Sequence, residues 1–314
     1  MYHIITNPEA GKKRANQYLP HLFSLFEKDN IPFEVHITTG LMDGYYLARK
    51  FCQEDPDCAG IISMGGDGTA HEVVAGMVDA YDWSYTNRKI PIPLGIFPLG
   101  SGNDFLSTLE GSKNEAKYIR NQPVETLNIN FFNKIRIGET RTIDVLNANG
   151  MAFLNIANVG LDARIAQNAI ELKARYGQYA YLAAAYRSIS AHKNLKLEIK
   201  ADDKEISGEF TLAAVCNGQY YGGGMRVAPT AKIDDGKITL CLVKAMSKAK
   251  AMTIFPTVMI EQHVRLKAIS YTECKNVTIT LPDSKEILCL DGNIYPNKKT
   301  INFKVIPKVL DVFT

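Results

Sequence analysis

The chain has 314 residues, of which 46% are hydrophobic and 22% are charged, and its formal net charge at pH 7 is +3. This length allows two domains, and the composition is that of a soluble globular protein. The charge is too small to indicate nucleic-acid binding, although it does not oppose contact with an anionic membrane surface.

The first part of the chain, to about residue 125, alternates strand-like and helix-like segments. Apolar residues at helical spacing predict helices over residues 15–28 and 41–53. Short apolar or alternating runs predict strands, at residues 3–6, 33–38, 59–64 and 92–97. Because strands that alternate with helices form a mostly parallel sheet, we predict a doubly wound α/β domain. Its ligands should bind at the carboxyl ends of the strands, where three polar loops fall.

After Pro123 the sequence changes to a succession of strand-like runs. These runs cover residues 127–137, 141–146, 152–157, 195–200, 210–217, 237–243, 277–281, 287–290 and 301–305. Two helices interrupt them, a long one over about residues 163–191 and a shorter one over about 248–263. Successive strands with few crossovers predict an antiparallel β-sandwich. We therefore expect two domains, residues 1–130 and residues 131–314, with a last strand that can return to the first domain.

Two of the polar loops contain glycines that suit a phosphate group. The first loop, residues 7–13, also has two lysines, but a turn with solvated lysines explains it better on its own. The second loop, residues 65–69, has three glycines, which let a backbone turn tightly and approach a ligand. A helix N-terminus follows it and favours an anion. Thr69 and Glu72 have the spacing of a capping box, which predicts that this helix begins at Thr69.

The third loop, residues 100–105, contains Ser101 and Asp104 at capping spacing, so a plain helix start is one explanation for it. The aspartate of the second loop, Asp67, lies beside an expected anion site and implies a metal, a proton to move or a sugar hydroxyl to hold. The chain has no G-x-x-x-x-G-K-[ST] segment, so it is not a P-loop protein. It also lacks G-x-G-x-x-G after the first strand, which counts against an ordinary dinucleotide site.

Together these loops resemble the catalytic domain of the diacylglycerol kinases, a superfamily that includes sphingosine and ceramide kinases and soluble bacterial lipid kinases. The matching motifs are Asn7-Pro8 with Gly11-Lys12, residues 65–76, residues 98–105, residues 217–225, Ala228-Pro229, residues 234–236 and Asp291-Gly292. The resemblance covers almost the whole chain and implies an N-terminal domain like those of NAD kinases and phosphofructokinases. Those two families share the double-glycine aspartate motif, whereas the whole series of motifs is more specific.

The resemblance implies which residues contact the nucleotide. The matching positions are Asn7, Pro8, Glu9, Ala10, Gly11, Lys12, Thr38, Gly65, Gly66, Asp67, Gly68, Thr69, Ala70, His71, Glu72 and Ser101. Thr38 is identified by its place five residues before Asp43, and Thr39 is the alternative to it.

The resemblance also implies two magnesium sites. Positions that organise the catalytic magnesium network are matched by Asp67, Asp104 and Asp144. Asp235 matches a carboxylate ligand of a structural magnesium, with the backbone carbonyls of Lys232 and Lys237 as its companions. Carboxylate and carbonyl oxygens suit this hard cation. Without the resemblance, residues 234–236 would be interpreted as a simple turn between strands.

One position departs from the family pattern. Similar bacterial lipid kinases have a glutamate after the late aspartate-glycine pair, and it is assigned as the base for the lipid hydroxyl. This chain has Asn293 there, and an asparagine amide cannot take up a proton at neutral pH. Three explanations stay open. In the first, Asp67 acts as the base, as the equivalent aspartate is thought to in sphingosine and NAD kinases. In the second, the reaction needs little general-base help, because phosphoryl transfer depends mostly on positioning and charge neutralisation. In the third, the protein is a weak or inactive member.

We therefore predict an ATP- and Mg²⁺-dependent kinase that phosphorylates the hydroxyl of diacylglycerol or a related lipid, giving phosphatidic acid or an analogue. The lipid would enter between the domains, with its tails in an apolar groove that the second domain mostly supplies. A rival enzyme, an NAD kinase or sugar kinase, is disfavoured by the third loop and by Gly222-Gly223-Gly224. A second rival, a protein that binds nucleotide or lipid without catalysis, is motivated by Asn293.

Location follows from what the chain lacks. No stretch approaches the roughly 18 apolar residues of a membrane span, and residues 1–5 have neither the basic segment nor the apolar core of a signal peptide. We expect a cytoplasmic protein that contacts the inner membrane face transiently through its substrate. It should bind no nucleic acid, and an exposed sheet edge could pair two copies as a homodimer. The six cysteines form no C-x-x-C pair, so we expect free thiols rather than a zinc site or disulfides.

Overall fold

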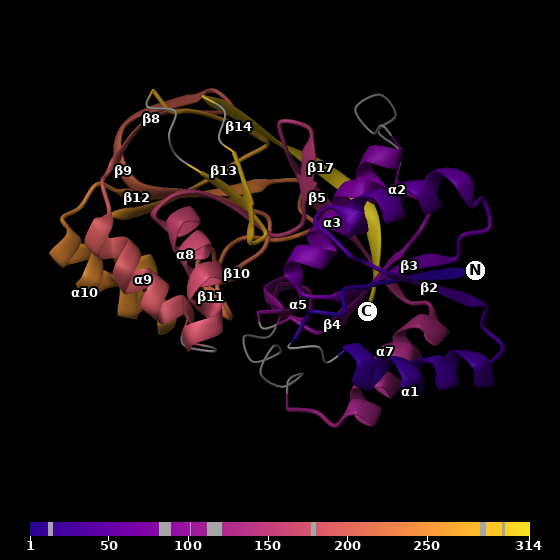
Figure 1. Ribbon diagram of the computed structural model, residues 1–314. Helices are drawn as coiled ribbons and strands as arrows, with labels where there is room; N and C mark the ends of the chain where they lie inside the picture. Colours follow the sequence, from indigo (N-terminus) through magenta and orange to yellow (C-terminus); the bar gives the residue numbers. More distant parts are fainter. Residues whose placement is uncertain are drawn as a thin grey trace. The chain divides into compact units, whose positions relative to one another are not determined.

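The computed structural model describes residues 1–11, 15–81, 89–100, 102–111, 121–176, 180–282, 287–296 and 299–314. They form two compact units (Figure 1). The N-terminal unit consists of Met1–Val145 and Pro307–Thr314, and the C-terminal unit of Leu146–Ile306. The predicted boundary between residues 130 and 131 falls inside a helix of the N-terminal unit.

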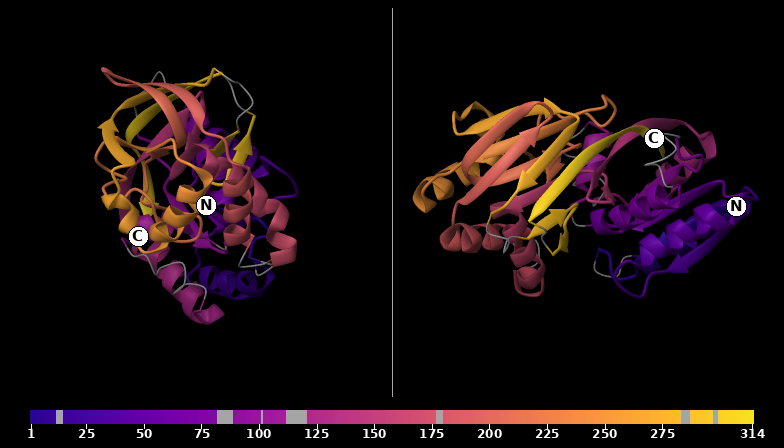
Figure 2. Two further views of the ribbon diagram at one scale, coloured as in Figure 1. Left: turned by 90° about the vertical axis from the view of Figure 1, so that its left-hand side faces the viewer. Right: turned by 90° about the horizontal axis from the view of Figure 1, so that it is seen from above.

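The N-terminal unit contains a parallel sheet in the order β2-β1-β3-β4. Its strands are β1 (Tyr2–Thr6), β2 (Phe33–Ile37), β3 (Gly60–Gly65) and β4 (Leu94–Pro98). The long last strand, β17 (Thr300–Phe313), is the yellow strand of Figure 2, and its Val312 pairs in parallel with Leu94 of β4. The predicted α/β class of this unit is confirmed.

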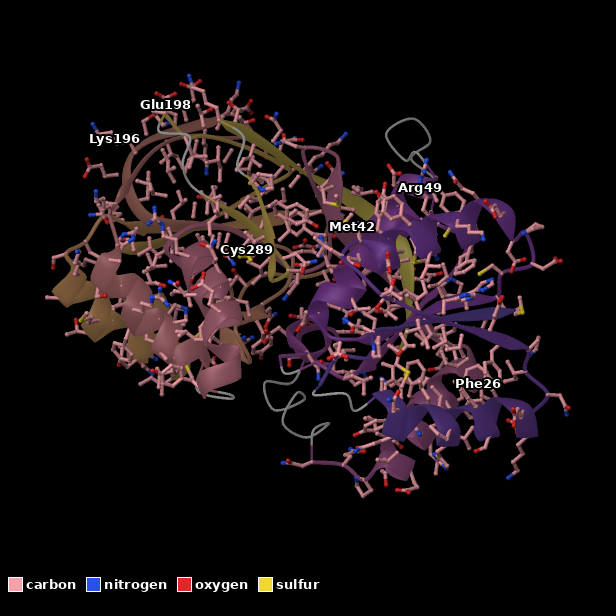
Figure 3. All side chains as sticks on the ribbon, in the orientation of Figure 1. Phe26, Met42, Arg49, Lys196, Glu198 and Cys289 are labelled. Atoms are coloured by element: carbon pink, nitrogen blue, oxygen red, sulfur yellow. The ribbon has the colours of Figure 1, made fainter. Side chains whose placement is uncertain are left out.

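Helices cover both faces of this sheet (Figure 1). They are α1 (Ala15–Lys28) and α7 (Val124–Ile137) on one face, and α2 (Asp43–Glu54) and α3 (Asp67–Ala80) on the other. Phe26 of α1, labelled in Figure 3, is fully buried and its ring lies edge-on to that of Phe132 of α7, with centroids 5.1 Å apart. Helices α2 and α3 approach closely at Gly76, where a Cβ would lie only 2.1 Å from the Tyr45 carbonyl oxygen.

Helix α7 overturns one prediction, since residues 127–137 were expected to form a strand. Its buried apolar residues, Leu127, Phe131, Phe132 and Ile135, recur at helical spacing. The aromatic and branched residues of this run favour a strand by composition, but the spacing lets one helical face pack against α1. Gly138, with φ of 75°, ends the helix in the left-handed conformation that glycine adopts readily.

The C-terminal unit is mainly antiparallel. Its strands are β6 (Met151–Phe153), β7 (Ile156–Gly160), β8 (Leu195–Ala201), β9 (Lys204–Cys216), β10 (Tyr220–Tyr221), β11 (Met225–Arg226), β12 (Ile238–Lys244), β13 (Ile269–Cys274), β14 (Asn276–Thr280), β15 (Leu288–Leu290) and β16 (Asn293–Tyr295). The strand β5 (Thr140–Ala148) leads into it from the N-terminal unit. The pairing order is β16-β15-β7-β9-β8-β14-β17, with β12 between β9 and β13. The predicted β-rich C-terminal domain is confirmed.

Two apolar cores lie in this unit. One gathers the inward side chains of strands such as β8, in which Leu195, Leu197 and Ile199 are buried while the residues between them are exposed. The other lies beneath α8 (Leu161–Tyr176), α9 (Ala180–Ala191) and α10 (Lys248–Met259), which gather on one side of the unit in Figure 1. The single helix predicted for residues 163–191 is thus two helices. The sequence between them contains Gly177, and glycine is a poor helix former.

Candidate active site

The second loop, residues 65–69, is called the glycine turn below and connects β3 to α3. Helix α3 begins at Asp67, with Gly66 at its N-cap, so the predicted start at Thr69 with a Thr69–Glu72 capping box is wrong. The Glu72 carboxylate instead accepts the N–H groups of Met42 and Gly44, at 3.1 and 3.2 Å. It therefore holds the start of α2 rather than the start of its own helix.

The glycines of the second and third loops allow these loops to touch through their backbones. A Cβ on Gly100 would lie 2.6 Å from the Cα of Gly66, so Gly100 has no room for a side chain, and a Cβ on Gly66 would be tight, at 3.1 Å from the Cα of Gly100. The N–H groups of Leu99 and Gly100 both donate to the Gly65 carbonyl, at 2.8 and 3.1 Å. At Gly65 itself a Cβ would lie 2.3 Å from Oγ1 of Thr69. Close packing between the loops is thus one reason for these glycines.

The first loop joins the same cluster through Asn7. The Asn7 N–H donates to the Met64 carbonyl at 3.0 Å, and Nδ2 lies 3.5 Å from Oγ1 of Thr69. Its Oδ1 accepts the Glu9 N–H at 3.0 Å, which closes a tight turn that continues through Gly11, with φ of 59°. The predicted nucleotide contacts Pro8 and Ala10 lie in this turn, whereas Lys12 lies outside the described residues.

The two candidate threonines after β2 have different partners. Both the N–H and the hydroxyl of Thr38 donate to the Thr6 carbonyl, at 2.9 and 3.3 Å. The N–H and hydroxyl of Thr39 donate to Oδ2 of Asp43, at 2.7 and 2.9 Å. The Thr39 amide hydrogen bond lowers the pKa of the Asp43 carboxyl below its usual range. Thr38, which follows β2, is buried beside the last residue of β1, Thr6. Thr39 belongs to the turn that precedes α2.

Asp67 and Asp104 bring two carboxylates to one place. A Cβ on Gly102 would lie 2.9 Å from Oδ2 of Asp104 and 3.0 Å from Oδ2 of Asp67, so both oxygens border the same small space. The other oxygen of Asp67 accepts the N–H of Phe105 at 3.3 Å. The helix α5 (Asp104–Leu109) begins with Asn103 at its N-cap, so the capping spacing of Ser101 is not used. Ser101 lies outside the described residues.

Asp144 lies on β5 and is fully buried. Its Oδ1 accepts the N–H of Lys308 at 2.7 Å, and Lys308 has the unusual φ of 50°. Among the described residues, no group of three or more metal-ligating side chains within 4.8 Å of one another contains Asp67, Asp104 or Asp144. These aspartates alone therefore do not enclose a metal, and a magnesium ion here would need further oxygen ligands from phosphate or water.

Asn103 belongs to the site although sequence reasoning gave it no role. It is 3% exposed, has φ of 52°, and its Nδ2 has no hydrogen-bond partner among the described residues. It borders a cavity of about 10 Å³, enough for about one water molecule. The cavity is lined by Gly65, Gly66, Asp67, Ala70, Ile96, Asn103, Phe105 and Leu106. The sequence signal that could have identified it is an asparagine directly before a predicted helix, because asparagine adopts positive φ more often than most residues.

The remaining predicted contacts on α3 face inward. The side chains of Ala70 and His71 are 3% and 0% exposed, so any contact with a nucleotide has to come from their backbone. Gly66, Asp67 and Gly68 are partly exposed. The accessible part of the turn is therefore residues 66–68.

The predicted structural magnesium site lies in the turn before β12. Oδ1 of Asp235 accepts the Lys237 N–H at 3.0 Å, and Gly236 has φ of 70°. Desolvation raises the pKa of the Asp235 carboxyl. A bound cation would oppose this shift, and the carboxylate with the carbonyls of Lys232 and Lys237 offers the oxygen ligands that magnesium accepts.

The late aspartate-glycine pair forms a tight hairpin between β15 and β16. Asp291 and Gly292 both have positive φ, of 49° and 91°, as in a two-residue type I′ turn. The Asp291 carboxylate accepts three backbone N–H groups at 2.7 to 2.9 Å, those of Leu154, Asn155 and Ile156. Asn293, at the position of the expected base, is the first residue of β16 and pairs with Leu290.

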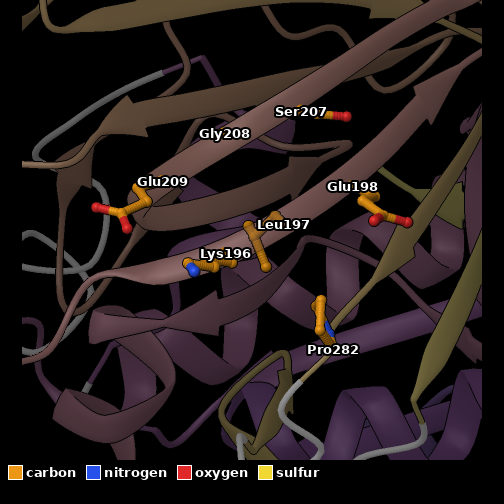
Figure 4. Close-up of a pocket in the computed structure, with 7 residues that line it drawn as sticks. All are labelled: Lys196, Leu197, Glu198, Ser207, Gly208, Glu209 and Pro282. Atoms are coloured by element: carbon orange, nitrogen blue, oxygen red, sulfur yellow. The ribbon is translucent and has the colours of Figure 1, made fainter.

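The three glycines at residues 222–224 join β10 to β11 and all have positive φ. Gly222 has φ of 64°, which favours glycine, and a Cβ there would also lie 2.7 Å from the Tyr181 ring. A separate hollow of about 260 Å³ lies beside β8 and β9 (Figure 4) and contains no predicted site residue. Its lining includes the charged side chains of Lys196, Glu198 and Glu209, which do not suit a lipid tail. None of the described helices combines the length and apolar character needed to cross a bilayer.

Two family models match the chain. Residues 1–148 match the diacylglycerol kinase catalytic domain. Residues 155–314, about half of the chain, match the YegS C-terminal NAD kinase beta sandwich-like domain. Together the two models cover both units described above.

Curated relatives match along nearly the whole chain. The diacylglycerol kinase of Bacillus subtilis (strain 168) is 27% identical over 290 residues, which is 92% of this chain and 88% of the relative. The diacylglycerol kinase of Staphylococcus aureus (strain bovine RF122 / ET3-1) is 28% identical over 312 residues, 99% of this chain and 91% of the relative. A solved structure of a putative diacylglycerol kinase from Bacillus anthracis str. Sterne has a TM-score of 0.76 at 21% identity, covering 99% of this chain and 96% of its own. That similarity supports the fold.

Proposed function

Because this chain is a kinase that belongs to the family joining a diacylglycerol kinase catalytic domain to a YegS-type C-terminal domain, we propose that it transfers the γ-phosphate of ATP to a lipid hydroxyl. Diacylglycerol or a closely related lipid is the proposed acceptor, and phosphatidic acid or its analogue the product. The match of both units to this family, with relatives named diacylglycerol kinase, supports this choice over an NAD kinase.

The observation that carries the proposal is the convergence of Asp67, Asp104 and Asn103 beside the glycine turn. Two carboxylate oxygens border one small space, and a buried amide donor without a partner lies in the wall of the adjoining cavity. Carboxylates suit a metal that carries phosphate, and an amide N–H suits a phosphate oxygen. A site that only packed two loops together would gain nothing from leaving such a donor unsatisfied.

We propose that the nucleotide phosphates lie over the partly exposed start of α3, where the helix dipole favours an anion. Asn7 holds the first loop against this turn, which keeps the proposed contacts at residues 7–11 near the phosphates. Lys12 and Ser101 stay in the proposal on the family resemblance alone.

Asp67 and Asp104 are the residues that would hold a magnesium ion. Magnesium supplies neutralisation of the negative charge on phosphate oxygens during phosphoryl transfer. Asp144, with its carboxylate fixed by the Lys308 N–H, stays a proposed outer member of this network. Asp235 with the carbonyls of Lys232 and Lys237 is the proposed structural magnesium site in the C-terminal unit.

We propose Asp67 as the group that accepts the proton of the lipid hydroxyl. It is partly exposed, whereas Asn293 offers only an amide, which cannot act as a base. Phosphoryl transfer with little base assistance is the alternative for an active enzyme. Transient contact with the inner membrane face would follow from a lipid substrate, and pairing of two copies stays a prediction.

The test is phosphorylation of a total lipid extract with radiolabelled ATP and Mg²⁺, with products identified by mass. We expect a labelled phosphatidic acid or a related lipid phosphate. Parallel reactions contain NAD or sugar phosphates, and labelling of NAD without any lipid product would overturn the proposal.

Asn293 favours a second candidate, a weak or inactive member of the family, and one variant tests it. If the wild type is inert with every lipid and Asn293→Glu creates lipid kinase activity, the chain is a degenerate member. If the wild type is active, a further gain in Asn293→Glu would show only that a second base helps.

A further inference from the structure

A second cluster of polar side chains lies at the opposite end of the N-terminal sheet from the glycine turn. His3 is near the start of β1, while the proposed nucleotide loop follows the end of that strand. In the parallel pairing of β1 with β2, His3 is opposite Glu34. Glu34 and His36 are two residues apart on β2 and therefore point to the same face of the sheet. The register thus places one carboxylate and two imidazoles together.

The atoms of this cluster face one another at distances close to those in a metal site. Nδ1 of His3 lies 3.1 Å from Nε2 of His36. Oε2 of Glu34 lies 3.9 Å from the His3 nitrogen and 3.7 Å from the His36 nitrogen. Ligand atoms around a tetrahedral zinc, each about 2.0 to 2.1 Å from the ion, are about 3.3 to 3.4 Å apart. Movements of a few tenths of an ångström would therefore suffice.

His3 is held in the orientation that such a site requires. Its Nε2 lies 2.8 Å from Oδ2 of Asp55, which assigns the proton to Nε2 and leaves the lone pair on Nδ1, facing His36. The ring is stacked on Phe51, with centroids 3.9 Å apart and planes 2° apart, and His3 is 2% exposed. A carboxylate on the far nitrogen of a histidine is the usual second partner of a zinc-binding imidazole.

We propose that His3 Nδ1, His36 Nε2 and the Glu34 carboxylate bind one zinc ion, with water completing the coordination. Two imidazoles with a carboxylate favour zinc over magnesium or calcium, which prefer oxygen ligands throughout. The Glu34 side chain is 56% exposed, so it has room to move toward the ion and leaves one side of the site open to water. The site is independent of the proposed kinase function.

Two other arrangements use the same residues. His3 and His36 can share a single proton as a plain hydrogen bond, in which case no metal binds. A metal could also lie on the other edge of His3, between Asp55 and Cys58. We place the ion on the His36 side because the hydrogen bond to Asp55 already occupies the other nitrogen of His3.

The experiment is a zinc titration of the full chain without an affinity tag, after treatment with a chelator. We expect one equivalent of Zn²⁺ to bind by calorimetry at pH 7.5, and Co²⁺ in its place to give the absorption of a tetrahedral complex. His36→Ala should weaken zinc affinity at least a hundredfold, and Glu34→Gln about tenfold. Asp55→Asn should weaken it about 10- to 100-fold, as expected for the partner of a ligating histidine.

Controls separate the site from general effects on folding. His21→Ala, in the same unit, and Cys58→Ser should bind zinc like the wild type. The melting temperature of each zinc-free variant shows that it folds, and only variants that retain the site should melt at higher temperature with zinc. Absence of zinc binding in the wild type, unchanged affinity in His36→Ala, or loss of binding in Cys58→Ser would each overturn the proposal. Kinase activity is not the readout, so failure here leaves the proposed function untouched.

Discussion

The glycine turn of the N-terminal unit and the hairpin at Asp291-Gly292 contain the same residue types but use their carboxylates differently. Oδ1 of Asp67 accepts the backbone N–H of Phe105, and Oδ2 borders a space that it shares with Asp104. Asp291 accepts three backbone N–H groups, those of Leu154 and Asn155 between β6 and β7 and that of Ile156, the first residue of β7. One carboxylate is positioned where a metal or a proton could reach it, and the other fixes the chain. Hydrogen-bond partners, rather than motif membership, separate the two roles.

Asp67→Ala should have the greatest effect of the substitutions considered, and this effect should be a loss of catalytic activity. If Asp67 is the base or holds magnesium, turnover with a lipid acceptor should fall at least about a hundredfold, and up to about ten-thousandfold. The melting temperature should change little, because Asp67 is partly exposed and its hydrogen bond from the Phe105 N–H is long, at 3.3 Å. Turnover near that of the wild type would show that Asp67 has no part in the mechanism and that it does not differ from Asp291 in this respect.

A third carboxylate, Asp162, extends the comparison to a fully buried position. Burial raises its pKa from 3.8 to about 6, while a hydrogen bond from Tyr221 opposes this, and its Oδ2 has no hydrogen-bond partner among the described residues. Between pH 4 and 6 the folded chain therefore holds a proton that the unfolded chain has released. The protonated Asp162 therefore contributes fully to stability below pH 4. As the pH rises through 6 this contribution is lost, and the free energy of unfolding falls by about 3 kcal/mol.

Asp162→Asn cannot ionise and should escape this loss. The free energy of unfolding of the variant, relative to the wild type, should increase by about 3 kcal/mol between pH 4 and pH 7. Urea unfolding at several pH values measures the difference, in which the contributions of all other groups cancel. A difference that does not change with pH would show that Asp162 ionises normally.

Asp291→Ala should act on stability rather than on chemistry. Three N–H groups would lose their acceptor, and we expect the free energy of unfolding to fall by about 2 kcal/mol. Activity per folded molecule should stay within about twofold of the wild type. Asp291→Asn is the matched control, because it keeps one side-chain oxygen and should lose less stability. A hundredfold loss of turnover in a folded Asp291→Ala variant would place this aspartate in the site.

The smallest effect is expected for Asn103→Gly. Glycine tolerates the positive φ of this position, so the backbone should be kept while the unpartnered Nδ2 is removed. If this amide donates to a phosphate oxygen, the KM for ATP should rise about tenfold, as for the loss of one hydrogen bond to a charged group. Steady-state kinetics at saturating lipid provide the measurement. An unchanged KM for ATP would leave the cavity beside the glycine turn without a role in nucleotide binding.

Several features of the molecule were predictable because they depend on residues near one another in the chain. Apolar periodicity identified helices at residues 15–28 and 41–53 and the strands between them, and the motif order indicated the family. The errors were also local. Residues 127–137 were expected to form a strand although the spacing of their buried apolar residues is helical. Thr69 and Glu72 have the spacing of a capping box, but Glu72 accepts hydrogen bonds at the start of α2.

The succession of elements, the three polar loops and the family pattern follow from the order of the amino acids alone, because turn chemistry and periodicity are short-range properties. Which side chains meet depends on how the chain folds in three dimensions. The fold brought Asp67 to Asp104, gave Asp291 its three amides and placed His3 beside His36, across 33 residues of chain. No spacing in the sequence marks that histidine cluster, because the register of β1 and β2 creates it. The glycine turn was visible in the sequence, but the need for its glycines came from a backbone 34 residues away that packs against it.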